Sequence, residues 1–154
     1  MREKGLTYVE LMIVLALMVI LAGAALPLVH HKYRAMQEEE LRRKLTMMRS
    51  AIDRYHEMAS QGMIEPWDLD WMMYPEDLEM LVEGVEVRMS MEQPPQTVRF
   101  LREIPVDPMT CERDWMCRGY DDDPDDFQRS CDTLYDVASS SRRQALDGTY
   151  YEEW

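Results

Sequence analysis

Glu10 is a carboxylate placed where a charge is costly, at the start of a long apolar segment. The residues that follow it, Leu11 to Val29, form a charge-free run of 19 residues. As a helix this run extends about 28 Å, close to the thickness of the hydrocarbon core of a bilayer. A carboxylate beside such a segment is costly unless a positive group neutralises it, which makes it a functional candidate. The position therefore predicts that Glu10 pairs with a positive group.

The three cysteines of the chain are the next residues that could form a covalent bond. Cys111, Cys117 and Cys131 lie within 21 residues, which predicts one disulfide and one free thiol in an oxidising compartment. A bridge to Cys131 would tie successive strands across an acidic loop at residues 121–126. The pairings Cys117–Cys131 and Cys111–Cys131 are therefore both favoured over Cys111–Cys117. The spacing lacks the C-x-x-C pattern of a zinc site.

The charge distribution divides the chain into two parts. The net charge is −13, with 9 Lys and Arg against 7 Asp and Glu in residues 1–61, and 8 against 23 in residues 62–154. An acidic domain repels the phosphates of nucleic acids, so we expect no nucleic-acid partner. We find no nucleophile beside a base, no phosphate-binding loop and no paired catalytic carboxylates in the sequence, and therefore predict that the protein is not an enzyme.

A single long helix is predicted to position Glu10, running from about Leu6 to Gln61. Its first half is apolar on all sides, and its second half carries an apolar stripe at intervals of three and four residues. We expect this stripe to pack beneath strands of the same chain rather than in a coiled coil, because those strands otherwise lack an apolar partner. The stripe consists of Leu41, Leu45, Met48, Ile52, Tyr55 and Ala59.

Shorter elements are predicted after Gly62, in the acidic part of the chain. Pro75 suits the first turn of a short helix that ends near Gly84. Residues 85–97 form a weak alternating strand that ends at a pair of prolines. One domain of modest size follows the long helix. A long helix followed by a short helix and strands predicts the fold class α+β.

The N-terminal segment resembles type IV pilins and the pseudopilins of type II secretion. In these proteins a prepilin peptidase cleaves after a glycine and methylates the new N-terminus, and a glutamate follows five residues later. By this resemblance the cleaved bond is Gly5–Leu6, and Glu10 is the assembly glutamate that pairs with the terminal amine of a neighbouring subunit. Leu6 departs from the usual phenylalanine. Pro27 falls where pilins often carry a proline that weakens the helix.

Three later blocks are similar to the major pseudopilins of type II secretion. They are the Tyr-Pro helix at residues 74–82, the Ile-Pro-x-Asp-Pro turn at residues 104–108, and the Asp-Gly to Trp ending at residues 147–154. The resemblance also implies a small antiparallel sheet whose first strand carries Trp115 and whose next strand is residues 133–139. The implied fold is a long N-terminal helix packed against this sheet and a short helix.

The resemblance also implies a calcium site near the C-terminal end of the sequence. Asp147 matches the aspartate of the Asp-Gly pair, and Glu152 and Glu153 stand where Asp or Asn often precede the final tryptophan. Calcium needs six to eight oxygen ligands, so backbone carbonyls would have to supply the rest. The alternative is an acidic turn closed by Trp154 packing on the sheet.

The predicted organisation is a leader at residues 1–5, a membrane or filament-core half-helix at 6–29, an amphipathic half-helix at 30–61 and an acidic head at 62–154. The expected function is a structural subunit of a type II secretion pseudopilus. The subunit would lie in the inner membrane before assembly and in a periplasmic or extracellular filament afterwards. Its partners would be other copies of itself, minor pseudopilins or pilins, the prepilin peptidase and the inner-membrane assembly platform.

Several alternatives stay open at the level of the sequence. The protein could be a type IV pilus subunit used for adhesion, motility or DNA uptake. It could instead be a membrane-anchored periplasmic calcium-binding module that never polymerises. The N-terminal segment could also be a secretory signal peptide cleaved near Ala22-Gly23-Ala24 or a plain signal anchor. Neither of these last two readings requires a glutamate at position 10.

Overall fold

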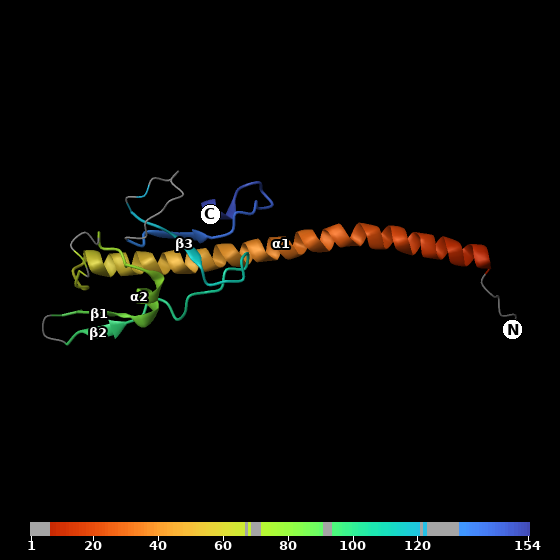
Figure 1. The fold of residues 1–154 in the computed structure, drawn as a ribbon. Coiled ribbons are helices and arrows are strands. Elements are labelled where there is room, and N and C mark those ends of the chain that lie inside the picture. Colours follow the sequence, from red (N-terminus) through yellow and green to blue (C-terminus); the bar gives the residue numbers. More distant parts are fainter. Residues whose placement is uncertain (1–6, 67, 69–71, 91–93, 121, 123–132) are drawn as a thin grey trace, which may run out of the picture. The chain divides into compact units, whose positions relative to one another are not determined.

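The computed structural model is an α+β protein with a long N-terminal helix (Figure 1). It describes residues 7–66, 68, 72–90, 94–120, 122 and 133–154, without the side chains of residues 24–29. In chain order the elements are α1 (Tyr8–Ser60), α2 (Leu78–Glu83), β1 (Val85–Val87), β2 (Gln96–Val98), β3 (Trp115–Arg118), β4 (Asp136–Ser139) and the short 3₁₀ helix η1 (Tyr151–Glu153).

The chain divides into two compact units, residues 1–37 and residues 38–154. The first unit holds the N-terminal part of α1, and its described side chains from Tyr8 to Leu21 are exposed. No helix in the described part of the chain is long and apolar enough to cross a membrane. The charge-free segment predicted at residues 11–29 includes residues 24–29, whose side chains the structure does not describe.

In the second unit, the predicted apolar stripe of α1 is confirmed as the centre of the hydrophobic core. All six stripe residues are at most 3 % exposed. They pack with side chains of the acidic part of the chain, and the ring of Tyr55 meets Phe100 edge-on with centroids 5.6 Å apart. The expectation that the stripe packs inside its own chain is therefore confirmed, because helix formation and core burial use the same 3.6-residue period.

The predicted short helix is present, but it begins later than expected. α2 starts at Leu78 because the Asp77 side chain caps it, accepting the Met80 N–H at 2.7 Å. Pro75 is thus not in the first helical turn, and that detail of the prediction was wrong. Gly84 ends the helix with φ 97°, and an added Cβ would lie 2.9 Å from side-chain atoms of Thr97 and Arg99. This position therefore requires glycine.

The described strands form two separate two-stranded antiparallel sheets. The predicted pairing of the Trp115 strand with the strand after residue 133 is confirmed as β3 and β4, and the second sheet, β1 and β2, was not predicted. Val85 pairs with Val98 in the first sheet, and Trp115 pairs with Ser139 in the second. The predicted strand at 85–97 is in fact a hairpin, since β1 ends at Val87 and the chain returns as β2. Trp115 begins β3 as predicted, and β4 covers only the second half of residues 133–139.

Candidate functional site

Glu10 lies in the first turn of α1, where the preceding threonine caps the helix. The Glu10 N–H donates to Thr7 Oγ1 at 3.3 Å, and the Leu11 N–H donates to the Thr7 carbonyl at 3.1 Å. The sequence Thr-x-x-Glu is the pattern of a capping box. A carboxylate in the first turn also interacts favourably with the positive end of the helix dipole, which stabilises the helix. Glu10 therefore has a local role in starting the helix, in addition to its predicted role in assembly.

The other predicted processing and assembly residues are only partly described. Gly5 and Leu6 lie outside the described residues, so the cleavage site stays a prediction. Pro27 lies within α1, whose helical backbone includes residues 23–27, but its side chain is not described. α1 runs without a break through Pro27, where the resemblance implied a weakened helix.

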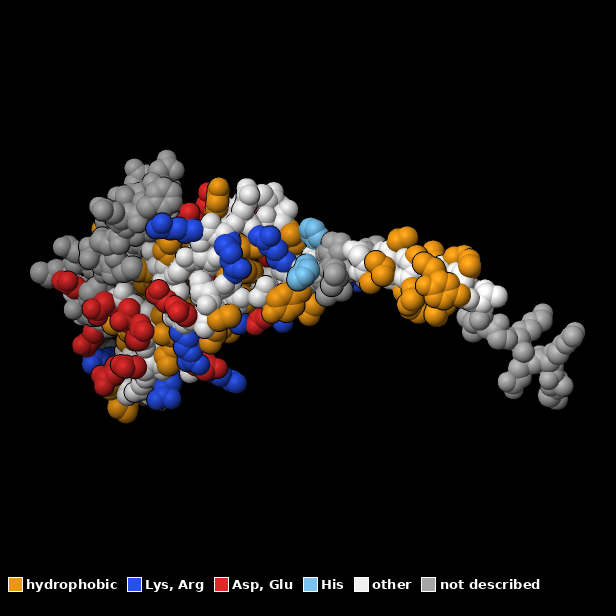
Figure 2. Space-filling view, turned by 45° about the vertical axis from the view of Figure 1, so that its right-hand side comes forward, with side chains coloured by type: hydrophobic (Ala, Val, Ile, Leu, Met, Phe, Trp, Pro, Cys, Tyr) orange, Lys and Arg blue, Asp and Glu red, His pale blue; other side chains and the backbone are white. Residues whose placement is uncertain are grey.

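Apolar side chains cover the described start of α1 and are exposed in the single chain. Figure 2 shows them as the orange surface near the N-terminal end. Leu21 is 69 % exposed and Val19 is 72 % exposed. The exposed apolar residues of this segment are Tyr8, Val9, Leu11, Met12, Ile13, Val14, Leu15, Leu17, Met18, Val19, Ile20 and Leu21. Contiguous exposed apolar surface of this kind marks a contact with lipid or with other proteins.

Charged residues of α1 hold the C-terminal segment of the chain in the second unit. Arg49 Nε donates to Asp136 Oδ1 at 2.6 Å, and Arg49 Nη2 donates to the Trp154 backbone oxygen at 2.7 Å. Glu38 Oε1 accepts the Leu146 N–H and the Tyr151 hydroxyl, both at 2.8 Å. We call this cluster the C-terminal clamp; it consists of Glu38, Arg49, Asp136, Leu146, Tyr151 and Trp154.

The C-terminal clamp was missed by sequence reasoning. Glu38, Arg42 and Arg49 lie off the apolar stripe, on the charged side of the helix. Arg42 places its guanidinium 3.7 Å from the centroid of the Trp154 ring, which is a cation–π contact. The partners of these residues follow about 90 to 110 positions later in the chain, and no local pattern links charges over such a separation.

The three residues predicted to bind calcium do not share a ligand cluster. Asp147 Oδ1 accepts the Thr149 N–H at 3.0 Å and the Thr149 hydroxyl at 2.6 Å, and these bonds lower the pKa of Asp147. Glu153 accepts the Tyr150 N–H at 3.2 Å, and Glu152 lies 4.0 Å from Arg142. Among the described residues, no three acidic, His or Cys side chains form a metal-binding group. The three side chains therefore make separate contacts in this structure, and calcium binding stays a prediction.

The calcium prediction has a direct test by calorimetric titration of the full chain. If the resemblance holds, added Ca²⁺ will give a saturable heat at one site, and Asp147→Ala will abolish it because a carboxylate ligand is lost. Asp114→Ala is the matched control, since Asp114 is also exposed but lies elsewhere in the second unit. A titration of the unmodified chain without saturable heat would contradict the prediction.

The cysteine chemistry is resolved in part. Cys117 on β3 is disulfide-bonded, whereas Cys111 is free and exposed. The alternative pairing of Cys111 with Cys131 is therefore wrong. Cys131 lies outside the described residues, and the pairing of Cys117 with Cys131 stays a prediction.

Thiol labelling is expected to separate the cysteines. In denaturant without a reductant, a maleimide should modify one thiol per chain, at Cys111, because the disulfide protects the others. After reduction all three cysteines should react. Mass mapping of the unreduced peptides will identify the bridge, and labelling at Cys117 before reduction would contradict the assignment.

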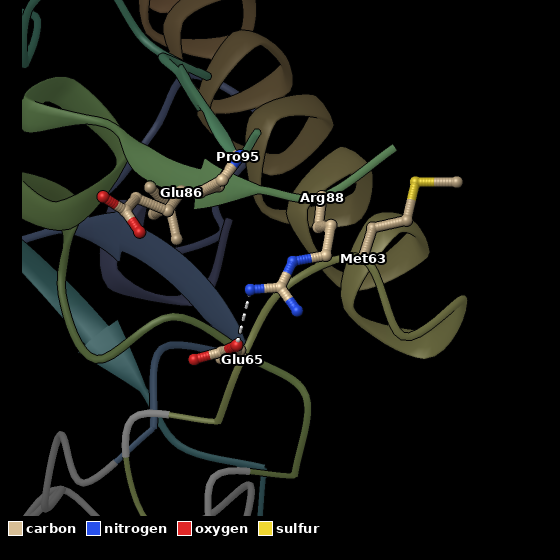
Figure 3. A pocket seen from close by; sticks show the side chains of 6 residues that line it. Met63, Glu65, Glu86, Arg88 and Pro95 are labelled. Atoms are coloured by element: carbon tan, nitrogen blue, oxygen red, sulfur yellow. Dashed lines mark ion pairs between the residues drawn. The ribbon is translucent and has the colours of Figure 1, made fainter. Parts of the chain in front are cut away.

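Described residues of the second unit line a smaller and a larger hollow, which differ in the charge of their lining. The smaller has a volume of about 130 Å³ beside β1 and is lined in part by Met63, Glu86 and Pro95 (Figure 3). Arg88 also lines it and pairs with Glu65 at 3.4 Å, so one of its two carboxylates faces a cation. The larger, about 340 Å³, lies between α2 and β3.

Comparison of this chain with family models, with curated proteins and with solved structures finds no match. The described elements define the class as an α+β protein in which one long helix contributes its second half to the core of the acidic head.

Proposed function

We propose that this protein is a structural subunit of a pilus-like filament, of the pseudopilus type that supports protein secretion. In this proposal a prepilin peptidase removes residues 1–5 at the inner membrane. The apolar start of α1 then leaves the lipid and packs with the same segment of other copies. The acidic heads form the outer shell of the filament.

The observation that carries the proposal is the exposed apolar surface from Tyr8 to Leu21. Moving one large apolar side chain from water to apolar surroundings stabilises a protein by about 1.5–3 kcal/mol. This segment buries none of its large apolar residues in the described single chain, so a strong driving force is left for an external partner. Lipid before assembly and neighbouring helices after assembly both satisfy that requirement.

Glu10 supports a filament of defined register rather than a simple lipid anchor. A signal anchor gains nothing from a charge at the edge of its apolar segment, because the charge must stay hydrated. A neighbouring subunit with a free terminal amine would give Glu10 an opposite charge. Since breaking a buried ion pair leaves an uncompensated charge, such a pair would penalise incorrect axial positions of the subunit.

Intact mass and electron microscopy of the native protein test the proposal together. Processing predicts a mature protein that lacks residues 1–5 and carries one added methyl group on Leu6. Filaments should appear when the polymerising apparatus is present. A mature protein that lacks 24 or 25 residues would identify a signal peptide instead, and a processed protein that stays monomeric would support the non-polymerising module.

A further inference from the structure

The larger hollow of the second unit has an apolar floor that the fold holds in place. We call it the α2–β3 groove; it has a volume of about 340 Å³. Leu78, Trp115 and Leu134 line it and are almost completely buried beneath its surface, and Ile104 is half-buried. The indole N–H of Trp115 donates to the Pro105 carbonyl at 2.8 Å, which fixes the ring. The floor is therefore preformed, as in most ligand grooves.

Four carboxylates surround this floor. Glu76 and Asp77 directly precede α2, Glu79 lies in its first turn, and Asp114 is the residue before β3. All four are exposed. Among the described residues, no Lys, Arg or His side chain pairs with any of them. Asp77 uses one oxygen to cap α2, and the other oxygen remains available at the rim.

Among the described residues that line the groove, Arg113 is the one cation, and it is already matched. Its Nη2 lies 3.2 Å from Glu103 Oε2, in an exposed ion pair. The rim as a whole is therefore negative. On the face drawn in Figure 2, acidic side chains gather on this unit.

We infer that the α2–β3 groove docks a basic segment of a partner protein, one that presents Lys or Arg next to an aliphatic side chain. The aliphatic side chain would lie on the floor formed by Leu78, Ile104 and Trp115, and the flanking cations would face the carboxylates of the rim. Charge complementarity of this kind selects partners and speeds their encounter. A second copy fits less well, because each copy carries a net charge of −13. The inference does not depend on filament formation.

Fluorescence anisotropy with a defined probe tests this inference on the full chain in a neutral detergent. The probe is a short labelled peptide of alternating lysine and leucine. We expect saturable binding that weakens about fivefold in the double variant Glu76→Gln with Glu79→Gln, because two rim charges are lost. The control variant, Glu83→Gln with Glu86→Gln, has the same change in net charge. Both of its residues are exposed and lie outside this groove, so its affinity should stay close to that of the unmodified chain.

A second variant tests the apolar floor separately from the charge. Ile104→Ala should weaken the lysine–leucine peptide about threefold and leave a lysine–serine peptide unchanged, with an unaltered circular dichroism spectrum. Equal weakening by the groove and control variants would show general attraction to an acidic surface and would overturn the inference. Self-association that is lost in the groove variant alone would assign the groove to a second copy, and would overturn it as well.

Discussion

Replacing Glu10 with alanine is expected to impair filament formation strongly while leaving membrane insertion and cleavage intact. The apolar segment and the cleavage site are unchanged in this variant, so the earlier steps should proceed. Assembly would leave the terminal amine of a neighbouring subunit without its partner, at a cost of about 3 kcal/mol. That cost corresponds to roughly a hundredfold weaker association of subunits. Filament yield by electron microscopy and intact mass of the subunit measure the two effects.

The cap at Thr7 makes glutamine the decisive comparison for Glu10. Glutamine also suits this position of a capping box, but it carries no charge. If Glu10 acts through an ion pair between subunits, Glu10→Gln will assemble as poorly as Glu10→Ala. Assembly of Glu10→Gln at the normal yield would show that the residue serves only to start the helix. Normal assembly of both variants would remove Glu10 from the mechanism altogether.

A second large effect is expected at Asp107, which is completely buried in the turn between two prolines. Its Oδ2 accepts the Ser139 hydroxyl at 2.5 Å, and its Oδ1 accepts the Met109 N–H at 2.7 Å. Asp107→Ala leaves both buried donors without an acceptor, and each costs about 1–3 kcal/mol. We therefore expect the free energy of unfolding to fall by about 3 kcal/mol, measured by urea unfolding with linear extrapolation.

Two further variants give this prediction its controls. Asp107→Asn keeps an acceptor for Met109 and offers an amide that can bond the Ser139 oxygen, so it should lose much less stability than alanine. Asp114→Ala removes an exposed carboxylate nearby and should change stability by less than about 0.5 kcal/mol. Equal losses in the alanine and asparagine variants would show that the charge of Asp107, rather than its hydrogen bonds, stabilises the turn.

The elements with a local repeat could be predicted from the sequence. The stripe from Leu41 to Ala59 follows the period of an α-helix, and the structure buries every member of it. The short helix before Gly84 could be predicted from its apolar spacing and glycine stop, although its first turn lies after Pro75. The strand that begins at Trp115 was expected only from the resemblance to pseudopilins. The division of the strands into two sheets could not be predicted, since the short strands carry no signal for their pairing.

The sequence alone determined the long helix, its apolar start and the acidic character of the head, because these depend on residue type and on spacing within a few turns. Only the tertiary structure decided that Arg49 holds Asp136 and Trp154, and that Asp107 is buried against Ser139. It also decided that the carboxylates of α2 and Asp114 surround one groove. These contacts join residues far apart in the chain, where side-chain geometry in the folded core, and not local pattern, selects the partner.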